Sequence, residues 1–310
     1  MEPMLDHISV CICTYKRPQM LVHLLSELQN LKTENVFTYS VVVVDNDSSR
    51  SAENAVLSIK EKSKIAIAYY SEPEQNIALA RNMAIENAKG DFIAFIDDDE
   101  FPEAEWLLNL YKTIKNSRVD GVLGPVRPYY PDGVPQWLIK SKLCERSEHE
   151  TGTILRWDET RTGNVLLKKN LFDDSKHRFG REFGLSGGED MEFFKKMFGI
   201  GKVFVWCNEA PVFETVPPAR WSEIFHKKKN LRIGGLTGEK IRKTPSQWYL
   251  FIKASLALVL YIVALPIAAI LGKPIYMRCL CKYAYYNGWL KGFFGYAFNR
   301  NRDNALHLIS

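Results

Sequence analysis

The sequence Asp91-Phe-Ile-Ala-Phe-Ile-Asp97-Asp98-Asp99-Glu100 decides how the rest of the chain is interpreted. Its apolar run, Phe92 to Ile96, is typical of a strand that is buried on both faces of a parallel sheet. Because unpaired carboxylates are not buried inside a sheet, we expect the four acidic residues at the point where this strand ends. In open α/β sheets, ligands bind at that edge.

Four neighbouring carboxylates repel one another and bind protons more tightly unless a cation lies among them. Oxygen ligands of this kind suit Mg²⁺ or Mn²⁺. The cluster therefore predicts a divalent-metal site. The alternative is a solvated acidic turn at the start of a helix, since acidic side chains favour helix N-termini.

Two earlier segments repeat this plan of an apolar strand followed by polar residues. Ile8–Cys13 leads into Thr14-Tyr15-Lys16-Arg17, and Tyr39–Val44 leads into Asp45-Asn46-Asp47. Helical patterns lie between these strands, and a further short strand is expected over residues 65–70. The alternation predicts an α/β domain with a Rossmann-like, mostly parallel central sheet flanked by helices. The polar strand ends would then form a nucleotide-sized crevice at one edge of the sheet.

Two common nucleotide-binding loops are missing from the sequence. No Gly-x-Gly-x-x-Gly follows the first strand, which disfavours a dehydrogenase, and there is no Walker-type glycine-rich loop. We therefore expect the phosphates of a nucleotide to be held through a carboxylate-bound metal.

The second half of the domain is expected to contain a helix over about 103–116 and strands near 121–126, 165–167 and 202–206. The segment Tyr129–Trp137 is rich in turn formers and aromatics and is interpreted as a loop over the site. Gly187-Gly188-Glu189-Asp190 precedes another helix. The glycines would let the backbone approach a ligand closely, and the acids would lie at the helix start. A plain acidic N-cap is the alternative.

The C-terminal third differs in composition. Basic residues outnumber acidic ones between His226 and Lys243, which favours an anionic partner. Ser255–Leu271 contains no charge, and extended back to Trp248 the segment is long enough to span a bilayer. Tyr276–Phe298 mixes cations with aromatics, as helices at membrane surfaces do. We expect attachment to an anionic membrane surface, with a buried helix hairpin in a soluble protein as the alternative.

These observations predict one α/β domain over residues 1–220, in two halves that meet at about residue 100. A basic linker over 221–247 and membrane-associated helices over 248–310 would follow. The six cysteines have neither zinc-site spacing nor a disulfide framework, and no signal peptide is expected, so a reducing compartment is predicted. The basic segment belongs to no recognised nucleic-acid module, and we expect no nucleic-acid partner.

Five motifs occur in an order that resembles family 2 glycosyltransferases, which have the GT-A fold. They are Thr14-Tyr15, Val44-Asp45-Asn46, Ala80-Arg81-Asn82, Asp97-Asp98-Asp99 and Gly188-Glu189-Asp190. The resemblance covers roughly Ile8 to Pro217 and is strongest to bacterial exopolysaccharide transferases of the succinoglycan type.

The resemblance implies that residues 1–220 form the GT-A catalytic domain, with a nucleotide-sugar half over about 1–100 and an acceptor half over about 101–220. It also implies roles for particular residues. Asp190 would be the general base with Glu189 beside it, and Asp99 would bind Mg²⁺ or Mn²⁺. The nucleotide-sugar site, with Asp45 on the base, would comprise Thr14, Tyr15, Arg17, Asp45, Asn46, Asn76, Arg81, Asp97 and Asp98. Acceptor binding would involve Gly163, Asn164 and Gly188.

The function implied is transfer of a sugar, with inversion, from a UDP-sugar to a lipid-linked saccharide in bacterial exopolysaccharide or lipopolysaccharide synthesis. The chain would act at the cytoplasmic side of the inner membrane. A nucleotidyltransferase and a non-catalytic nucleotide-sugar-binding membrane protein are the alternatives.

Overall fold

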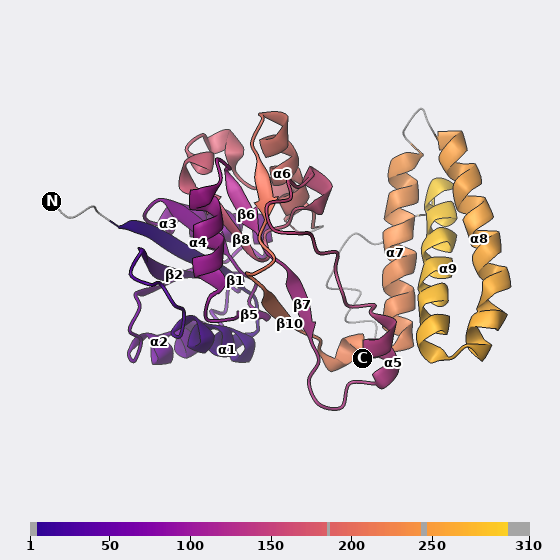
Figure 1. The fold of residues 1–310 in the computed structure, drawn as a ribbon, viewed down its shortest axis with the longest axis horizontal. Coiled ribbons are helices and arrows are strands. Elements are labelled where there is room, and N and C mark those ends of the chain that lie inside the picture. The colour runs from indigo at the N-terminus through magenta and orange to yellow at the C-terminus, as the bar shows by residue number, and fades with distance from the viewer. Residues whose placement is uncertain (1–4, 185–186, 243–246, 297–310) are drawn as a thin grey trace. The chain divides into compact units, whose positions relative to one another are not determined.

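The computed structural model describes residues 5–184, 187–242 and 247–296 (Figure 1). The chain divides into two compact units. Met1–Pro128 and Arg146–Thr215 form the first, called here the sheet unit. Tyr129–Glu145 and Val216–Ser310 form the second, called here the helical unit. The ends of the predicted segments, including Lys243 and residues 297–310, lie outside the described residues.

The sheet unit is built on a seven-stranded sheet in the order β3-β2-β1-β4-β8-β6-β9. Parallel pairing joins β1 to β2 and β4, β2 to β3, and β6 to β9. Strand β8 runs antiparallel to both neighbours, β4 and β6. The predicted mostly parallel sheet is confirmed. Its strands are β1 (Asp6–Thr14), β2 (Phe37–Asp45), β3 (Ile67–Ser71), β4 (Phe92–Phe95), β6 (Gly121–Leu123), β8 (Val165–Lys168) and β9 (Phe204–Trp206).

Strand register brings the polar strand ends together. Thr14, the last residue of β1, pairs with Asp45, the last residue of β2. On its other side, Cys11 of β1 pairs with Phe95, the last residue of β4. The residues that follow these three strands therefore leave the sheet at the same edge, as the sequence predicted.

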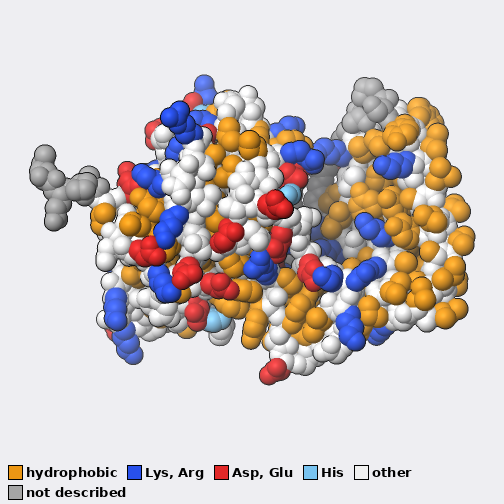
Figure 2. Space-filling view, in the orientation of Figure 1, with side chains coloured by type: hydrophobic (Ala, Val, Ile, Leu, Met, Phe, Trp, Pro, Cys, Tyr) orange, Lys and Arg blue, Asp and Glu red, His pale blue; other side chains and the backbone are white. Residues whose placement is uncertain are grey.

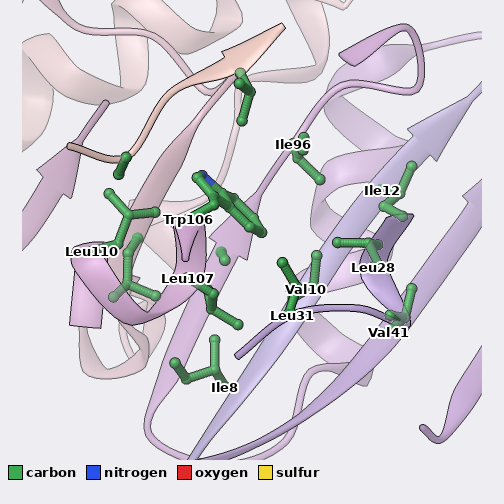
Figure 3. Close-up of a cluster of buried hydrophobic side chains, with 14 of the residues drawn as sticks. Ile8, Val10, Ile12, Leu28, Leu31, Val41, Ile96, Trp106, Leu107 and Leu110 are labelled. Atoms are coloured by element: carbon green, nitrogen blue, oxygen red, sulfur yellow. The ribbon is translucent and has the colours of Figure 1, made fainter. Parts of the chain in front are cut away.

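Both faces of the sheet are buried, as the unbroken apolar runs predicted. Alternate residues of β1 enter different clusters: Ile8, Val10 and Ile12 lie on one face, and Cys11 lies on the other. The first cluster includes Leu28 of α1 and Trp106 of α4 (Figure 3). The helices of the sheet unit are α1 (Pro18–Leu28), α2 (Glu53–Lys60), α3 (Ile77–Asn87), α4 (Trp106–Asn116) and α6 (Glu189–Gly199).

A second, three-stranded sheet has the order β5-β10-β7. Its strands are β5 (Glu100–Pro102), β7 (Val126–Tyr129) and β10 (Val212–Thr215). The antiparallel pairing of β5 and β10 sets Glu214 opposite Glu100. This sheet therefore brings a further carboxylate to the acidic segment.

The helical unit contains α5 (Gln136–Ser141), α7 (Glu223–Ile241), α8 (Gln247–Ile270) and α9 (Lys273–Phe293). The segment Tyr129–Trp137 was predicted as a loop over the site. Residues 130–135 form this loop, between the end of β7 and the first turn of α5, and the segment belongs to the helical unit. Its position over the site stays a prediction. The predicted basic linker contains α7. Within the described residues, α8 is the helix long and apolar enough to cross a membrane, and 6% of its most apolar window is buried. It is therefore not a buried core helix.

Helices α7 and α9 run parallel and touch through glycines. A Cβ at Gly234 or Gly238 of α7 would overlap the carbonyl oxygen of Tyr285 or Trp289 in α9. Gly292 of α9 faces the carbonyl oxygen of Gly235 in the same way. Small residues spaced four apart are what lets two helix backbones approach this closely.

We predict that Gly292→Ala destabilises the helical unit, because its methyl group would overlap the backbone of α7. Overpacking of this kind costs about 1–3 kcal/mol. Gly199→Ala is the matched control, since nothing lies within 4 Å of the Cβ it would add. The control should be neutral or stabilising by up to about 1 kcal/mol. Urea unfolding monitored by circular dichroism measures both. Equal stability of the two variants would contradict the glycine contact.

Candidate active site

The acidic segment forms a tight turn at the end of β4. The backbone N–H of Glu100 donates to the carbonyl oxygen of Asp97 at 3.1 Å, and the Asp97 N–H donates to the Glu100 carboxylate at 3.2 Å. Asp97 is half exposed, whereas Asp98 and Glu100 are buried. The turn thus presents one carboxylate to solvent and encloses the others.

Burial and mutual repulsion raise the proton affinity of these carboxylates. Burial is the main cause that raises the pKa of Asp99 to about 6, and the charge of Asp97 adds to it. Burial raises the pKa of Asp98 as well, against the lowering effect of Arg17 and Thr14. The pKa of Glu100 lies well above its usual range because it is buried beside Asp97 and Asp99. The protein therefore only partly offsets the cost of enclosing these carboxylates.

Arg17 partly compensates this charge. Its Nη1 lies 3.0 Å from Asp98 Oδ1 and 3.1 Å from Asp99 Oδ2. Thr14 donates its hydroxyl to the other Asp98 oxygen at 2.8 Å. The end of β1 is thus bound directly to the end of β4. Tyr15, half-buried after Thr14, was predicted to line the nucleotide-sugar site, and this role stays a prediction.

Asp45 was expected to hydrogen-bond the base, and its carboxylate accepts hydrogen bonds from groups within the protein. It is fully buried. Its carboxylate accepts hydrogen bonds from the Ala52 N–H at 2.8 Å, the Tyr69 hydroxyl at 3.0 Å and the Asp47 N–H at 3.2 Å. It therefore holds the turn after β2, and its hydrogen bond to a base stays a prediction.

Asn46 and Asn76 form one buried network. Asn46 accepts the Asn76 N–H at 2.8 Å and donates to the carbonyl oxygens of Glu72 and Glu74. The Asn76 side chain caps α3 by accepting the N–H groups of Ala78 and Leu79. Both amides are occupied within the protein, so they shape the nucleotide edge rather than offer free hydrogen bonds to a ligand.

Arg81, on α3, connects the acidic turn to the start of α6. Its Nη1 hydrogen-bonds Glu189, and its Nη2 lies 3.7 Å from Asp97 Oδ1. The Arg81 and Glu189 side chains are 9% and 5% exposed. Glu189, predicted to be beside the base, is thus an enclosed ion-pair partner, and among the described residues its other oxygen has no hydrogen-bond partner.

Asp190 follows Glu189 in the first turn of α6 and is more open. It accepts the N–H of Met191 at 2.8 Å. The glycine before the two acids, Gly188, has φ 101°, a left-handed conformation that favours glycine, and a Cβ there would meet open space. The backbone at this helix start is free of side-chain bulk, and its approach to a ligand stays a prediction.

Gly163 and Asn164 occupy different environments. A Cβ on Gly163 would lie 2.9 Å from Glu100 Oε1, so this glycine lets β8 pass close to the acidic turn. Asn164 is fully buried. It accepts the Trp106 indole N–H at 2.7 Å and donates to the carbonyl oxygens of Pro125 and Ala210. Its amide is therefore used inside the core and does not reach an acceptor.

Arg161 is a site residue that the sequence interpretation missed. Burial and the neighbouring Arg146 lower its pKa, whereas Glu100, Asp190 and Glu214 act in the opposite direction. Within the described residues, no hydrogen bond or ion pair engages its guanidinium. It lines a cavity of about 220 Å³ together with Ser147, His149, Asp158, Glu159 and Thr160. Its position two residues before Gly163 was the available signal, but no pattern links an isolated arginine to this turn.

The donor set of the acidic turn suits a hard cation, although it does not form a complete cage. Among residues 5–184, 187–242 and 247–296, no three His, Cys, Asp or Glu side chains are arranged to hold a metal ion. Carboxylate oxygens short of positive charge fit a Mg²⁺ or Mn²⁺ ion whose remaining ligands come from a diphosphate and water. The metal role of Asp99 remains a prediction.

Solved structures share this fold. The structure of residues 1–349 of Staphylococcus aureus TarS in complex with UDP-GlcNAc matches with a TM-score of 0.54 and 17% sequence identity, over 94% of this chain and 93% of that one. The same TarS fragment with UDP matches with a TM-score of 0.52. The sheet unit thus has the glycosyltransferase GT-A fold, which confirms the expected architecture.

Sequence comparisons define the family. The family model "Glycosyl transferase family 2" matches residues 9–186, more than half of the chain. Succinoglycan biosynthesis protein ExoM of Rhizobium meliloti is 35% identical over 235 residues, 75% of this chain and 74% of that protein. The chain therefore belongs to glycosyl transferase family 2. Hyaluronan synthase of Pasteurella multocida is 24% identical, and the match spans 70% of this chain but 25% of that protein.

The buried pair of Arg81 and Glu189 leads to a stability prediction. Arg81→Met should destabilise the sheet unit by about 3–5 kcal/mol, because it leaves the Glu189 charge enclosed without a partner. Adding Glu189→Leu removes that charge and should restore part of the loss. Urea unfolding at neutral pH measures all three proteins. The control is Arg156→Met, which breaks the exposed pair with Asp158 and should change little. A double variant less stable than Arg81→Met would contradict the ion-pair argument.

The raised pKa of Asp99 predicts a pH dependence. Between about pH 4 and pH 6 the unfolded chain releases this proton while the folded chain keeps it. The free energy of unfolding should therefore fall as pH rises through this window, by up to about 3 kcal/mol. In Asp99→Asn, the part of this fall in the free energy of unfolding that the Asp99 carboxyl causes should be absent. Urea unfolding of both proteins across the window isolates it, because the other carboxyls are common to both. Parallel pH profiles would rule it out.

Proposed function

We propose that this family 2 glycosyltransferase moves a sugar from a UDP-sugar to a hydroxyl of a lipid-linked saccharide, with inversion at the anomeric carbon. The observation that carries the proposal is the bridge made by Arg81, which joins Asp97 of the acidic turn to the helix start that bears Asp190. The departing diphosphate needs positive charge beside it, whereas the attacking hydroxyl needs a carboxylate that takes its proton. This bridge sets the groups for both within one site.

On the donor side, Tyr15 stacks on the base, and Asp97 and Asp98 lie near the ribose and sugar. Arg17 already lies at the carboxylates where the diphosphate would bind. Because that group gains negative charge as it departs, a fixed guanidinium beside it stabilises the transition state more than the ground state. A Mg²⁺ or Mn²⁺ ion held by Asp99 would supply further charge neutralisation when bound.

On the acceptor side, Asp190 takes the proton of the attacking hydroxyl. A sugar hydroxyl is a poor nucleophile and requires such a base. Attack on the face opposite the departing diphosphate, with one base and no covalent intermediate, inverts the anomeric centre. The guanidinium of Arg161, which has no hydrogen bond or ion pair among the described residues, lines a polar cavity with Ser147, Asp158 and Thr160 that is suited to hold the acceptor saccharide.

The relatives support the biological setting. One is named a succinoglycan biosynthesis protein, and another, TarS of Staphylococcus aureus, is a poly(ribitol-phosphate) β-N-acetylglucosaminyltransferase. Both names concern polymers of the cell surface. We place the present chain in exopolysaccharide or lipopolysaccharide synthesis at the cytoplasmic face of a bacterial inner membrane, attached through its C-terminal helices. Family membership favours this function over a nucleotidyltransferase.

We predict that Asp190→Asn lowers sugar transfer by about 10²- to 10⁴-fold, the usual contribution of a general base. Binding of UDP, measured by calorimetry, should change little, because the substitution leaves the donor side intact. Asp173→Asn, at an exposed position, is the control and should retain full activity. Unchanged turnover in Asp190→Asn would refute the assignment of the base.

We also predict that a chelator stops sugar transfer by the unaltered protein and that added Mg²⁺ or Mn²⁺ restores it.

A further inference from the structure

Helix α8 exposes an apolar surface along its whole length. Large apolar side chains that are half or more exposed recur along it, and orange side chains cover this part of the helical unit in Figure 2. They are Trp248, Tyr249, Ile252, Leu256, Val259, Leu260, Ile262, Val263, Ile267 and Ile270. Monomeric proteins rarely leave a continuous patch of this kind in water. Something apolar must cover it.

Helix α8 does not stand alone. The ring of Phe251, near its start, lies 5.1 Å from Phe293 of α9, and Tyr261 stacks on Tyr286 at 5.9 Å. Helix α9 is in turn held against α7 by the glycine contacts described above. Whatever depth α8 reaches in a membrane, α9 and α7 must therefore accompany it.

Helices α7 and α9 lack an uncharged stretch long enough to cross the hydrocarbon core of a bilayer. Their longest stretches without a charge are Ile233–Gly238 and Tyr283–Leu290. At 1.5 Å per residue these cover roughly 9 and 12 Å, against a core about 30 Å thick. Exposed cations interrupt the rest of both helices: Lys227, Lys228 and Lys240 on α7, and Lys273, Arg278, Lys282 and Lys291 on α9. Charged side chains at that depth carry a high cost.

Polar contacts hold the start of α9 against α5 and α7. Lys273, at the start of α9, pairs with Glu223 at 2.8 Å. Arg278 donates to the backbone carbonyl oxygens of Ser141 and Lys140, at the end of α5. The turn between α8 and α9 is therefore fixed to α5 and to the start of α7.

We propose that α7, α8 and α9 dock as one body on a single leaflet of an anionic bilayer and that none of them crosses it. The exposed face of α8 lies among the acyl chains, and the cations of α7 and α9 contact the anionic headgroups. Both ends of α8 then face the same compartment. The inference rests on the membrane attachment within the proposed function and is independent of the transfer reaction.

Vesicle flotation tests the surface. The full chain should float with phosphatidylcholine–phosphatidylglycerol vesicles and much less with phosphatidylcholine alone, and added salt should weaken the binding. Lys227→Gln and Lys228→Gln should each weaken it about fivefold. Leu256→Gln with Leu260→Gln should weaken it tenfold or more, whereas Leu57→Gln, an exposed leucine of α2, should not. A chain that dimerises and does not float would show that a second copy covers α8, and this would overturn the proposal.

Cysteine labelling tests the crossing. Arg242 directly follows α7, a few residues before α8 begins, and Leu271 directly follows α8. Arg242→Cys and Leu271→Cys would each be made in a chain whose half-exposed Cys13, Cys144 and Cys279 are replaced by alanine. A membrane-impermeant maleimide should label both positions in inverted bacterial membrane vesicles and neither in intact spheroplasts. Labelling of one position in spheroplasts would show that α8 spans the bilayer and would overturn the proposal. Transfer activity, assayed separately, would then still report on the proposed reaction.

Discussion

The ion pair between Arg81 and Glu189 is the constraint on which the site depends. An enclosed guanidinium must be matched by enclosed carboxylates, because removing two charges from water is offset only when they meet with good geometry. Arg81 meets Glu189 on one side and Asp97 on the other. Residues about a hundred positions apart in the sequence are thereby held at one point. The start of α6 can then present Asp190 toward the acidic turn, and the order of charges across the site follows from one arginine.

The same logic explains why the acidic turn is left short of positive charge. Three of its four carboxylates are largely enclosed, and Arg17 is shared between Asp98 and Asp99. A cluster fully neutralised by the protein would have little affinity for a metal–diphosphate. A cluster with no arginine would be too costly to bury. The observed arrangement lies between these limits, which suits the metal–diphosphate that we propose as its ligand.

Much of the sheet unit could be predicted from the sequence, because long apolar runs and helical periodicity are local signals. The strands ending at Thr14, Asp45 and Phe95 were placed within a few residues, and their common edge followed from parallel pairing. The antiparallel reversal of β8 could not be predicted, since strand direction depends on distant partners. The hydrogen bonds that Asp45 and Asn164 make within the protein could not be predicted for a related reason: a polar residue at a strand end can face a ligand or bind its own backbone. Only the fold decides which hydrogen bonds are available.

The division of the chain has a practical consequence for truncation. The backbone leaves the sheet unit after Pro128, returns at Arg146 and leaves again after Thr215. In the helical unit, Val134 and Leu138 of the excursion pack with Val216 in a small apolar cluster, and the Trp137 ring lies 6.2 Å from that of His226. A protein ended at Thr215 to improve solubility would retain the excursion but strip away its covering. The apolar side chains of Val134 and Leu138 would then be exposed to solvent. A shortened enzyme should therefore also have residues 129–145 replaced by a short polar linker.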